Sequence, residues 1–161
     1  MKFETIKENE FEYIEAGEGP VVVLLHGLMG DLDNFEGIID DLPNHGFKVV
    51  GPLLPLFEKP MLKTTIKHFT KYVYEFLKFK GFEKVTLLGN SLGGHISLVF
   101  AKEYPEMVES LILTGSSGLY ENAMGDSFPR RGDYDYIRTK TEEVFYDPKM
   151  ATKKLVDHVF E

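Results

Sequence analysis

Residues 85–94 read Val85-Thr86-Leu87-Leu88-Gly89-Asn90-Ser91-Leu92-Gly93-Gly94, and this stretch decides the fold of the 161-residue chain. An apolar run that ends at a glycine is typical of a strand buried on both faces. After Ser91, apolar side chains recur at helical spacing until Pro105, which predicts a helix. The serine therefore lies where a strand turns directly into a helix.

A turn of this kind holds its serine at strained backbone angles, with the hydroxyl projecting above the sheet. Gly89 and Gly93, two positions either side of Ser91, must then lack side chains so that strand and helix can approach each other. The pattern Gly-x-Ser-x-Gly alone is a weak signal, and the alternative is a glycine-rich turn with an incidental serine. Because strand, turn and helix follow in the required order, we predict that Ser91 is a nucleophile.

A second motif follows another apolar strand, Val21 to Leu25. The chain continues as His26-Gly27-Leu28-Met29-Gly30 and then as Asp31 to Ile39, which resembles the start of a helix. A glycine-rich loop at the end of a parallel strand can direct backbone N–H groups into the crevice that holds the serine. Two such donors are what a tetrahedral oxyanion needs, and we expect them to be the N–H groups of Leu28 and Leu92.

Together the two motifs resemble those of the α/β-hydrolase superfamily, and more narrowly those of its small capped esterases, lactonases and carbon–carbon bond hydrolases. The resemblance covers essentially the whole chain. It implies that Ser91 is the catalytic nucleophile, that Leu28 and Leu92 form the oxyanion hole, and that His26 is structural. The elbow and loop glycines are Gly27, Gly89 and Gly93. Related dehalogenases carry aspartate at the nucleophile position, so a serine argues against that chemistry. No metal and no cofactor is implied.

The remaining pattern agrees with an α/β fold that has a mainly parallel sheet and flanking helices. We expect an opening hairpin of Lys2–Ile6 with Glu10–Ala16, and a short strand at Phe47–Val50. A helix closed by Gly81 should follow at Lys63–Lys80, and a further buried strand at Val108–Leu113. The ligand crevice of such a sheet lies at the carboxyl ends of its strands, where both motifs occur.

The character of the chain changes after Thr114. Residues 115–136 are rich in Gly, Ser, Asp and Arg, and two short helical patterns follow at about Tyr134–Phe145 and Asp147–Phe160. In the resembling family a helical cap follows the sixth strand of an eight-stranded core. We therefore predict a core at residues 1–115 with the first six strands, and the beginning of a cap at residues 116–161.

The resembling family carries its catalytic acid and histidine on loops after two further strands, beyond the cap. This chain contains neither strand, so we expect the fold to be truncated and the chain alone to be inactive, because serine needs an oriented base. None of its five histidines is assigned as that base: His26, His45, His68, His95 and His158. His26 belongs to the loop motif, His45 to a turn and His68 to an outer helix, and His95 is expected to pack against the sheet.

The strand at residues 108–113 would be flanked by the absent seventh strand. It then has a bare edge, and Leu111-Ile112-Leu113 contains no charge to protect it. We expect either a longer gene product, a dimer, or a complementing segment at this edge.

Composition limits the partners. A net charge of −8 disfavours nucleic acid and anionic membranes, and the absence of cysteine excludes disulfides, thiolate zinc sites and thiol nucleophiles. The N-terminal residues lack the apolar run of a signal peptide, and the apolar run Val21–Leu25 is too short to cross a bilayer, so we expect a cytoplasmic protein by default.

Four aspartates lie around a predicted helix: Asp31, Asp33, Asp40 and Asp41. They are better explained as solvated helix ends than as metal ligands.

The leading functional hypothesis is a serine hydrolase that acts on an ester, a lactone or a related small carbonyl substrate. The alternatives are a non-catalytic ligand-binding or partner-binding module of the same fold, and an inactive fragment. The identity of the substrate is not encoded in the fold.

Overall fold

The computed structural model describes residues 4–28, 32–56, 65–119, 132–143 and 145–160. The chain separates into two compact units, residues 1–121 and residues 122–161. The first unit contains the sheet, and the second contains two short helices.

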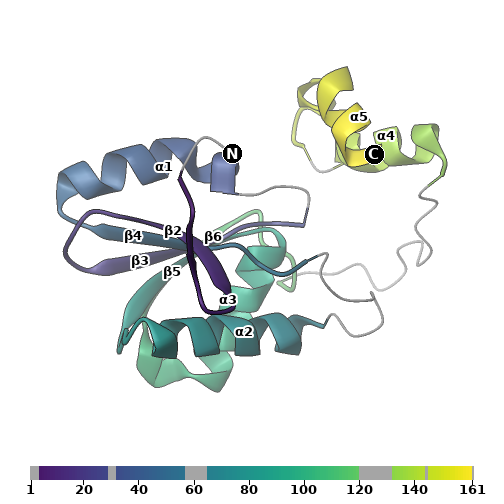
Figure 1. The fold of residues 1–161 in the computed structure, drawn as a ribbon. Coiled ribbons are helices and arrows are strands. Elements are labelled where there is room, and N and C mark those ends of the chain that lie inside the picture. Colours follow the sequence, from purple (N-terminus) through teal and green to yellow (C-terminus); the bar gives the residue numbers. More distant parts are fainter. Residues whose placement is uncertain (1–3, 29–31, 57–64, 120–131, 144, 161) are drawn as a thin grey trace. The chain divides into compact units, whose positions relative to one another are not determined.

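The first unit is built on a six-stranded sheet in the order β1-β2-β4-β3-β5-β6 (Figure 1). Its strands are β1 (Ile6–Glu8), β2 (Phe11–Ala16), β3 (Val21–Leu25), β4 (Lys48–Pro52), β5 (Val85–Asn90) and β6 (Val108–Thr114). The β1–β2 and β2–β4 pairs are antiparallel, and the other three pairs are parallel. The opening hairpin is therefore present, but its first strand is Ile6–Glu8 and not the predicted Lys2–Ile6. The predicted mainly parallel α/β sheet is therefore confirmed.

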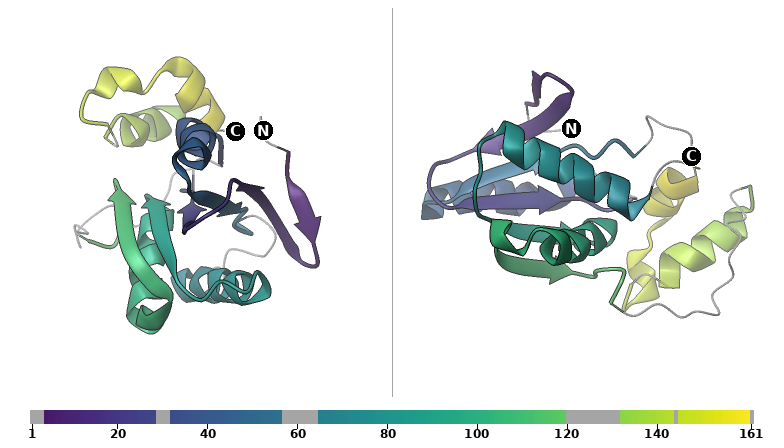
Figure 2. Two further views of the ribbon diagram at one scale, coloured as in Figure 1. Left: turned by 90° about the vertical axis from the view of Figure 1, so that its left-hand side faces the viewer. Right: turned by 90° about the horizontal axis from the view of Figure 1, so that it is seen from below.

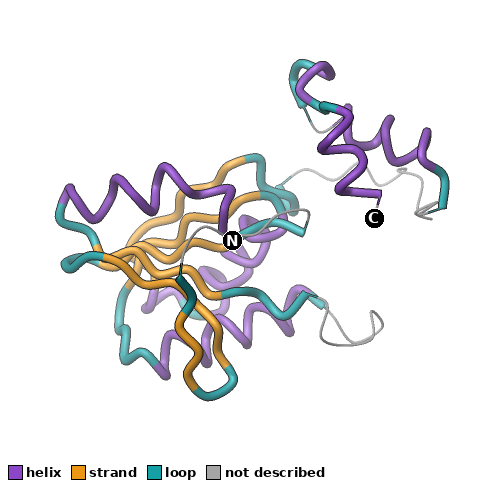
Figure 3. The backbone as a smooth tube through the Cα atoms, turned by 45° about the horizontal axis from the view of Figure 1, so that its top comes forward, coloured by secondary structure: helices purple, strands orange, loops and turns teal. Residues whose placement is uncertain are grey.

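Helices cover both faces of this sheet. Figure 1 and Figure 3 show α1 (Glu36–Asp41) on one face, and α2 (Ile66–Phe79) and α3 (Leu92–Glu103) on the other. Short 3₁₀ turns, Leu32–Phe35 and Leu42–His45, precede and follow α1. The predicted helices at the ends of β3 and β5 are thus present.

The period of two along the strands divides the core into two layers. On the α1 face, Val22 and Leu24 belong to a cluster with Leu32, Phe35 and Ile39. On the opposite face the neighbouring strand residues belong to a cluster with the apolar sides of α2 and α3, which includes Val23, Leu25, Phe76, Leu77, Ile96 and Phe100. Both faces of β3 are buried, which explains its uninterrupted apolar sequence.

Local signals set the limits of α2. The hydroxyl of Thr65 caps the first turn by accepting a hydrogen bond from the His68 N–H at 3.3 Å. Gly81 closes the other end with φ 70°, a left-handed conformation that favours glycine. The predicted helix began at Lys63, but residues 63 and 64 lie outside the described residues.

The prediction that residues 108–113 form a buried strand is only half right. The strand exists as β6, but most of its side chains are exposed, and Leu111 and Ile112 are 36% and 46% exposed. In the described part of the chain β6 pairs only with β5 and is the outermost strand of the sheet (Figure 2). An apolar sequence favours a strand, but burial also requires neighbours on both sides.

The second unit is a pair of helices, α4 (Tyr134–Glu143) and α5 (Lys153–Phe160). The Tyr134 hydroxyl donates a 2.6 Å hydrogen bond to Asp157, and its ring meets that of Phe160 edge-on, with centroids 5.3 Å apart. The two predicted helical patterns are therefore confirmed with shorter limits. That these helices begin a cap, with a boundary at residue 115, stays a prediction. Within the described residues, no helix is both long and apolar enough to span a membrane.

Candidate active site

Ser91 occupies the turn between β5, which ends at Asn90, and α3, which begins at Leu92. Its backbone angles are φ 52° and ψ −116°, a combination that costs free energy in a residue with a side chain. The serine is exposed at the carboxyl end of the central strands. The strained, accessible position expected from the sequence is therefore present.

The glycines on either side of Ser91 are required by packing. A Cβ atom on Gly93 would overlap the carbonyl oxygen of Leu25, and one on Gly89 would lie 2.6 Å from the backbone nitrogen of Gly94. These obstacles are backbone atoms, which cannot move aside as a flexible side chain can. Strand and helix therefore approach as closely as the sequence pattern indicated.

Gly27 brings the second motif next to the serine. A Cβ atom on Gly27 would lie 3.2 Å from the Cβ of Ser91. Strands β3 and β5 are parallel neighbours with Leu25 opposite Gly89, so the loops that follow them share one end of the sheet. The His-Gly loop and the serine turn thus form one site.

Leu28 follows the glycine that lies close to Ser91, and Leu92 follows Ser91 itself along the chain. Leu28 follows Gly27 directly and the residue is 55% exposed. Leu92 is the first residue of α3, and the first N–H groups of a helix have no partner within the helix. Of the loop motif, residues 29 and 30 lie outside the described residues.

His26 has the structural position that the resemblance implied. The side chain is buried, and its Nε2 accepts a 3.0 Å hydrogen bond from the N–H of Leu54. Nδ1 therefore carries the ring proton, and its N–H donates a 3.0 Å hydrogen bond to the carbonyl of Gly27. The neutral ring joins the loop after β3 to the segment after β4.

A third segment, residues 114–117 at the end of β6, also contacts the serine. The carbonyl of Thr114 accepts a hydrogen bond from the Ser91 N–H at 3.2 Å, and the Ser117 N–H donates one to the Ser91 carbonyl at 3.2 Å. No sequence pattern predicts these contacts, because a run of Gly and Ser resembles any loop. Only the parallel pairing of β5 with β6 brings the segment here.

The architecture and the two motifs agree with a comparison of the sequence with protein families. Residues 20–147 match the family described as alpha/beta hydrolase fold. This chain belongs to the α/β-hydrolase family.

Known relatives of this α/β-hydrolase chain include two proteins of Comamonas testosteroni. The 2-hydroxy-6-oxononadienedioate/2-hydroxy-6-oxononatrienedioate hydrolase is 30% identical, and the match covers 99% of this chain and 58% of the relative. The 2-hydroxy-6-oxo-6-phenylhexa-2,4-dienoate hydrolase is 29% identical, and the match covers 96% of this chain and 62% of the relative.

Among solved structures, MGS-MChE2, an alpha/beta hydrolase enzyme from the metagenome of sediments from the lagoon of Mar Chica, Morocco, is similar with a TM-score of 0.70 and 53% identity. The match covers 74% of this chain and 54% of that protein. The present α/β-hydrolase chain thus spans only 58% and 62% of the length of these two curated relatives.

The other histidines of this α/β-hydrolase chain have contacts of their own. His45 is exposed, and its Nδ1 lies 3.0 Å from the carbonyl of Asp41. His68 lies in the first turn of α2 beside Phe69. His95 is half-buried, so close to Gly118 that a Cβ atom there would lie 2.6 Å from its ring. The side chain of His158 is outside the described part of the structure.

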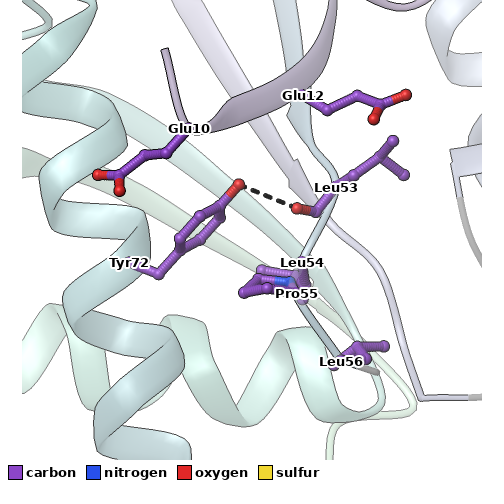
Figure 4. A pocket seen from close by; sticks show the side chains of 7 residues that line it. All are labelled: Glu10, Glu12, Leu53, Leu54, Pro55, Leu56 and Tyr72. Carbon is purple, nitrogen blue, oxygen red and sulfur yellow. Dashed lines mark hydrogen bonds between the residues drawn. The ribbon is translucent and has the colours of Figure 1, made fainter. Parts of the chain in front are cut away.

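A separate pocket of about 220 Å³ lies beside the segment after β4 (Figure 4). It is lined by Glu10, Glu12, Leu53, Leu54, Pro55, Leu56 and Tyr72, and the Tyr72 hydroxyl donates a 3.0 Å hydrogen bond to the Leu53 carbonyl. None of these residues belongs to the serine turn, so this pocket is distinct from the candidate active site of the α/β hydrolase.

Among the described residues, no group of three or more His, Asp or Glu side chains could hold a metal ion. Three of the aspartates considered from the sequence are exposed, namely Asp33, Asp40 and Asp41, and the fourth, Asp31, lies outside the described residues.

Proposed function

We propose that this protein is a serine hydrolase in which Ser91 attacks an ester, a lactone or a related small carbonyl substrate. The observation that supports the proposal is the exposed, strained Ser91 at the junction of β5 and α3, with the loop of Leu28 beside it. A residue keeps strained backbone angles only where the surrounding contacts hold it in that conformation. Strained residues of this kind cluster at active sites.

In the proposed reaction the Ser91 hydroxyl oxygen bonds to the carbonyl carbon, and its proton passes to a general base. The carbonyl oxygen becomes an oxyanion and accepts hydrogen bonds from the N–H groups of Leu28 and Leu92. When the tetrahedral intermediate collapses, the leaving group departs with the proton. Water then hydrolyses the acyl-enzyme by the same route and frees Ser91.

The general base and the acid that orients it are not assigned to this chain. Both ring nitrogens of His26 are engaged in structural hydrogen bonds. We propose that residues outside these 161 supply both groups, since the relatives are longer than this chain. Activity measurements therefore require the full product of the gene.

A fluorophosphonate probe tests the nucleophile. We expect it to label the full gene product and Ser91→Ala to abolish the labelling. Ser110→Ala is the matched control, because Ser110 is exposed on β6 and no catalytic role is proposed for it. Undiminished labelling of Ser91→Ala would reject the assignment.

The substrate class is tested by measuring turnover of a panel of substrates by the full gene product. The panel contains short p-nitrophenyl esters, lactones and a 2-hydroxy-6-oxo-dienoate, the last because the two Comamonas relatives are named for such compounds. Hydrolysis of any class that depends on Ser91 supports the proposal. Binding without turnover in the full gene product would instead identify a non-catalytic ligand-binding module.

A further inference from the structure

The carbonyl oxygen of Ser91 accepts three hydrogen bonds. One comes from the His95 N–H at 3.2 Å and is the first hydrogen bond of α3. The other two come from Ser117 in the segment after β6, from its N–H at 3.2 Å and from its hydroxyl at 3.4 Å. A loop that is distant in sequence thus contributes two of the three donors.

This carbonyl belongs to the peptide unit that links Ser91 to Leu92. The atoms of a peptide unit lie close to one plane, and in the trans form C=O and N–H point in opposite directions. The donors that hold the Ser91 carbonyl therefore also set the direction of the Leu92 N–H. They polarise it as well, because hydrogen bonds to the oxygen of an amide strengthen the donor at its nitrogen, by about 10–30% per bond.

The same segment holds the peptide on the other side of Ser91. The Thr114 carbonyl accepts hydrogen bonds from the Ser91 N–H at 3.2 Å and from the Asn90 side-chain amide at 2.9 Å. Both peptide planes next to the strained residue are therefore fixed by residues 114–117. A residue at φ 52° keeps this conformation only where such contacts compensate the strain.

We propose that Ser117 is a positioning residue that aims and polarises the Leu92 N–H toward the developing oxyanion. This inference deepens the proposed function and rests on it. Ser117 does not touch the substrate in this proposal, because it acts through the planar peptide between Ser91 and Leu92.

The first test is spectroscopic and needs no turnover. In ¹H–¹⁵N spectra of the chain, Ser117→Ala is expected to move the Leu92 amide proton upfield, because a less polarised N–H is a weaker donor. Ser117→Thr keeps the hydroxyl and should leave the resonance near its original position, and Ser110→Ala should not move it. An unchanged Leu92 resonance in a folded Ser117→Ala variant would overturn the proposal.

The second test is kinetic and uses the full gene product. Complete loss of an oxyanion donor costs about 10²–10³ in kcat, so weakening one by removing the Ser117 hydroxyl should cost about 2- to 10-fold in kcat with little change in KM. Affinity for a boronic acid that mimics the tetrahedral intermediate should fall in parallel, and Ser117→Thr should restore both quantities. A variant that loses only thermal stability, with kcat and boronate affinity unchanged, would contradict the inference.

The two proposals fail in different ways. If Ser91→Ala retained full activity, the proposed nucleophile would be wrong, whereas the Leu92 resonance would still report on Ser117. If Ser91→Ala were inactive but Ser117→Ala matched the wild type in both tests, only the positioning role would be rejected.

Discussion

The Nε2 atom of His26 lies 3.0 Å from the backbone nitrogen of Leu54 and accepts its hydrogen bond inside the protein. This bond joins the loop that carries Leu28 to the segment that follows β4. The histidine of the His-Gly pair therefore holds the loop in place, two residues before Leu28, the proposed oxyanion donor.

Replacement of this ring leaves a buried N–H without its acceptor. We expect His26→Ala to lower the free energy of unfolding by about 1–3 kcal/mol, the usual cost of an unsatisfied buried group. His45→Ala is the matched control, because His45 is exposed in a turn, and it should change stability by less than about 0.5 kcal/mol. Urea denaturation measures both, and equal stabilities would contradict the structural role.

Gly93 and Gly37 give opposite predictions for the same substitution. Gly93→Ala places a methyl group on the Leu25 carbonyl, so we expect loss of the native fold or of several kcal/mol. A Cβ added to Gly37, in α1, would have no atom within 4 Å other than those of its chain neighbours and its own helix backbone. Gly37→Ala should raise stability by about 0.4–1 kcal/mol. Thermal unfolding followed by circular dichroism distinguishes the two, and a Gly93→Ala variant as stable as Gly37→Ala would refute the packing argument.

The conformation of Ser91 predicts a conflict between stability and activity. Glycine adopts φ 52° without the steric cost that a side chain incurs. Ser91→Gly should therefore be more stable than Ser91→Ala by about 1 kcal/mol, while both lack the nucleophile. Chemical denaturation of the two variants measures the difference, and equal stability would show that this turn is not strained.

An ion-pair network around Glu15 of β2 predicts that the stability of the fold depends on pH. Glu15 contacts Lys48 at 2.7 Å and Lys80 at 2.6 Å, and all three side chains are less than a third exposed. Burial acts to raise the pKa of Glu15, but hydrogen bonds from the two lysines outweigh it and hold this pKa below its ordinary value of 4.5. The folded state therefore binds the Glu15 proton less readily than the unfolded state does.

This contribution to stability is present above pH 4.5 and is lost as the pH falls through the lowered pKa of the folded state. We expect Glu15→Gln to destabilise the protein by about 1–3 kcal/mol at pH 7 and progressively less in acid. Glu109→Gln is the control, because its pair with Lys84 is exposed and contributes little. A Glu15→Gln deficit that stayed constant into acid would contradict the linkage.

The outer edge of β6 predicts association. Because Leu111 and Ile112 are exposed beside a strand edge that is unpaired within the described residues, we expect the chain to self-associate or to take up a complementing strand. Sedimentation velocity should show a concentration-dependent shift that Leu111→Lys with Ile112→Lys reduces. A monomer at every concentration, without an added segment, would refute this expectation.

The sequence predicted most of the core because its signals are local. The uninterrupted apolar run Val21–Leu25 and the mainly apolar run Val85–Leu88 identified buried strands, and Gly89 and Gly93 identified two positions beside the turn that tolerate no side chain. The order of strand, turn and helix around Ser91 followed from the same patterns. The sequence could not show that β6 is largely exposed, because burial depends on which elements lie beside a strand.

The amino-acid sequence by itself determined the α/β class, the position of Ser91 and the glycines around it, since each depends on periodicity or on the size of one side chain. Only the tertiary structure showed that His26 holds the Leu54 N–H and that Thr114 and Ser117 hold the two peptides beside Ser91. Those partners are more than twenty residues apart along the chain, and parallel strand pairing brings them together. No local pattern records such contacts, because a backbone N–H or carbonyl is the same in almost every residue.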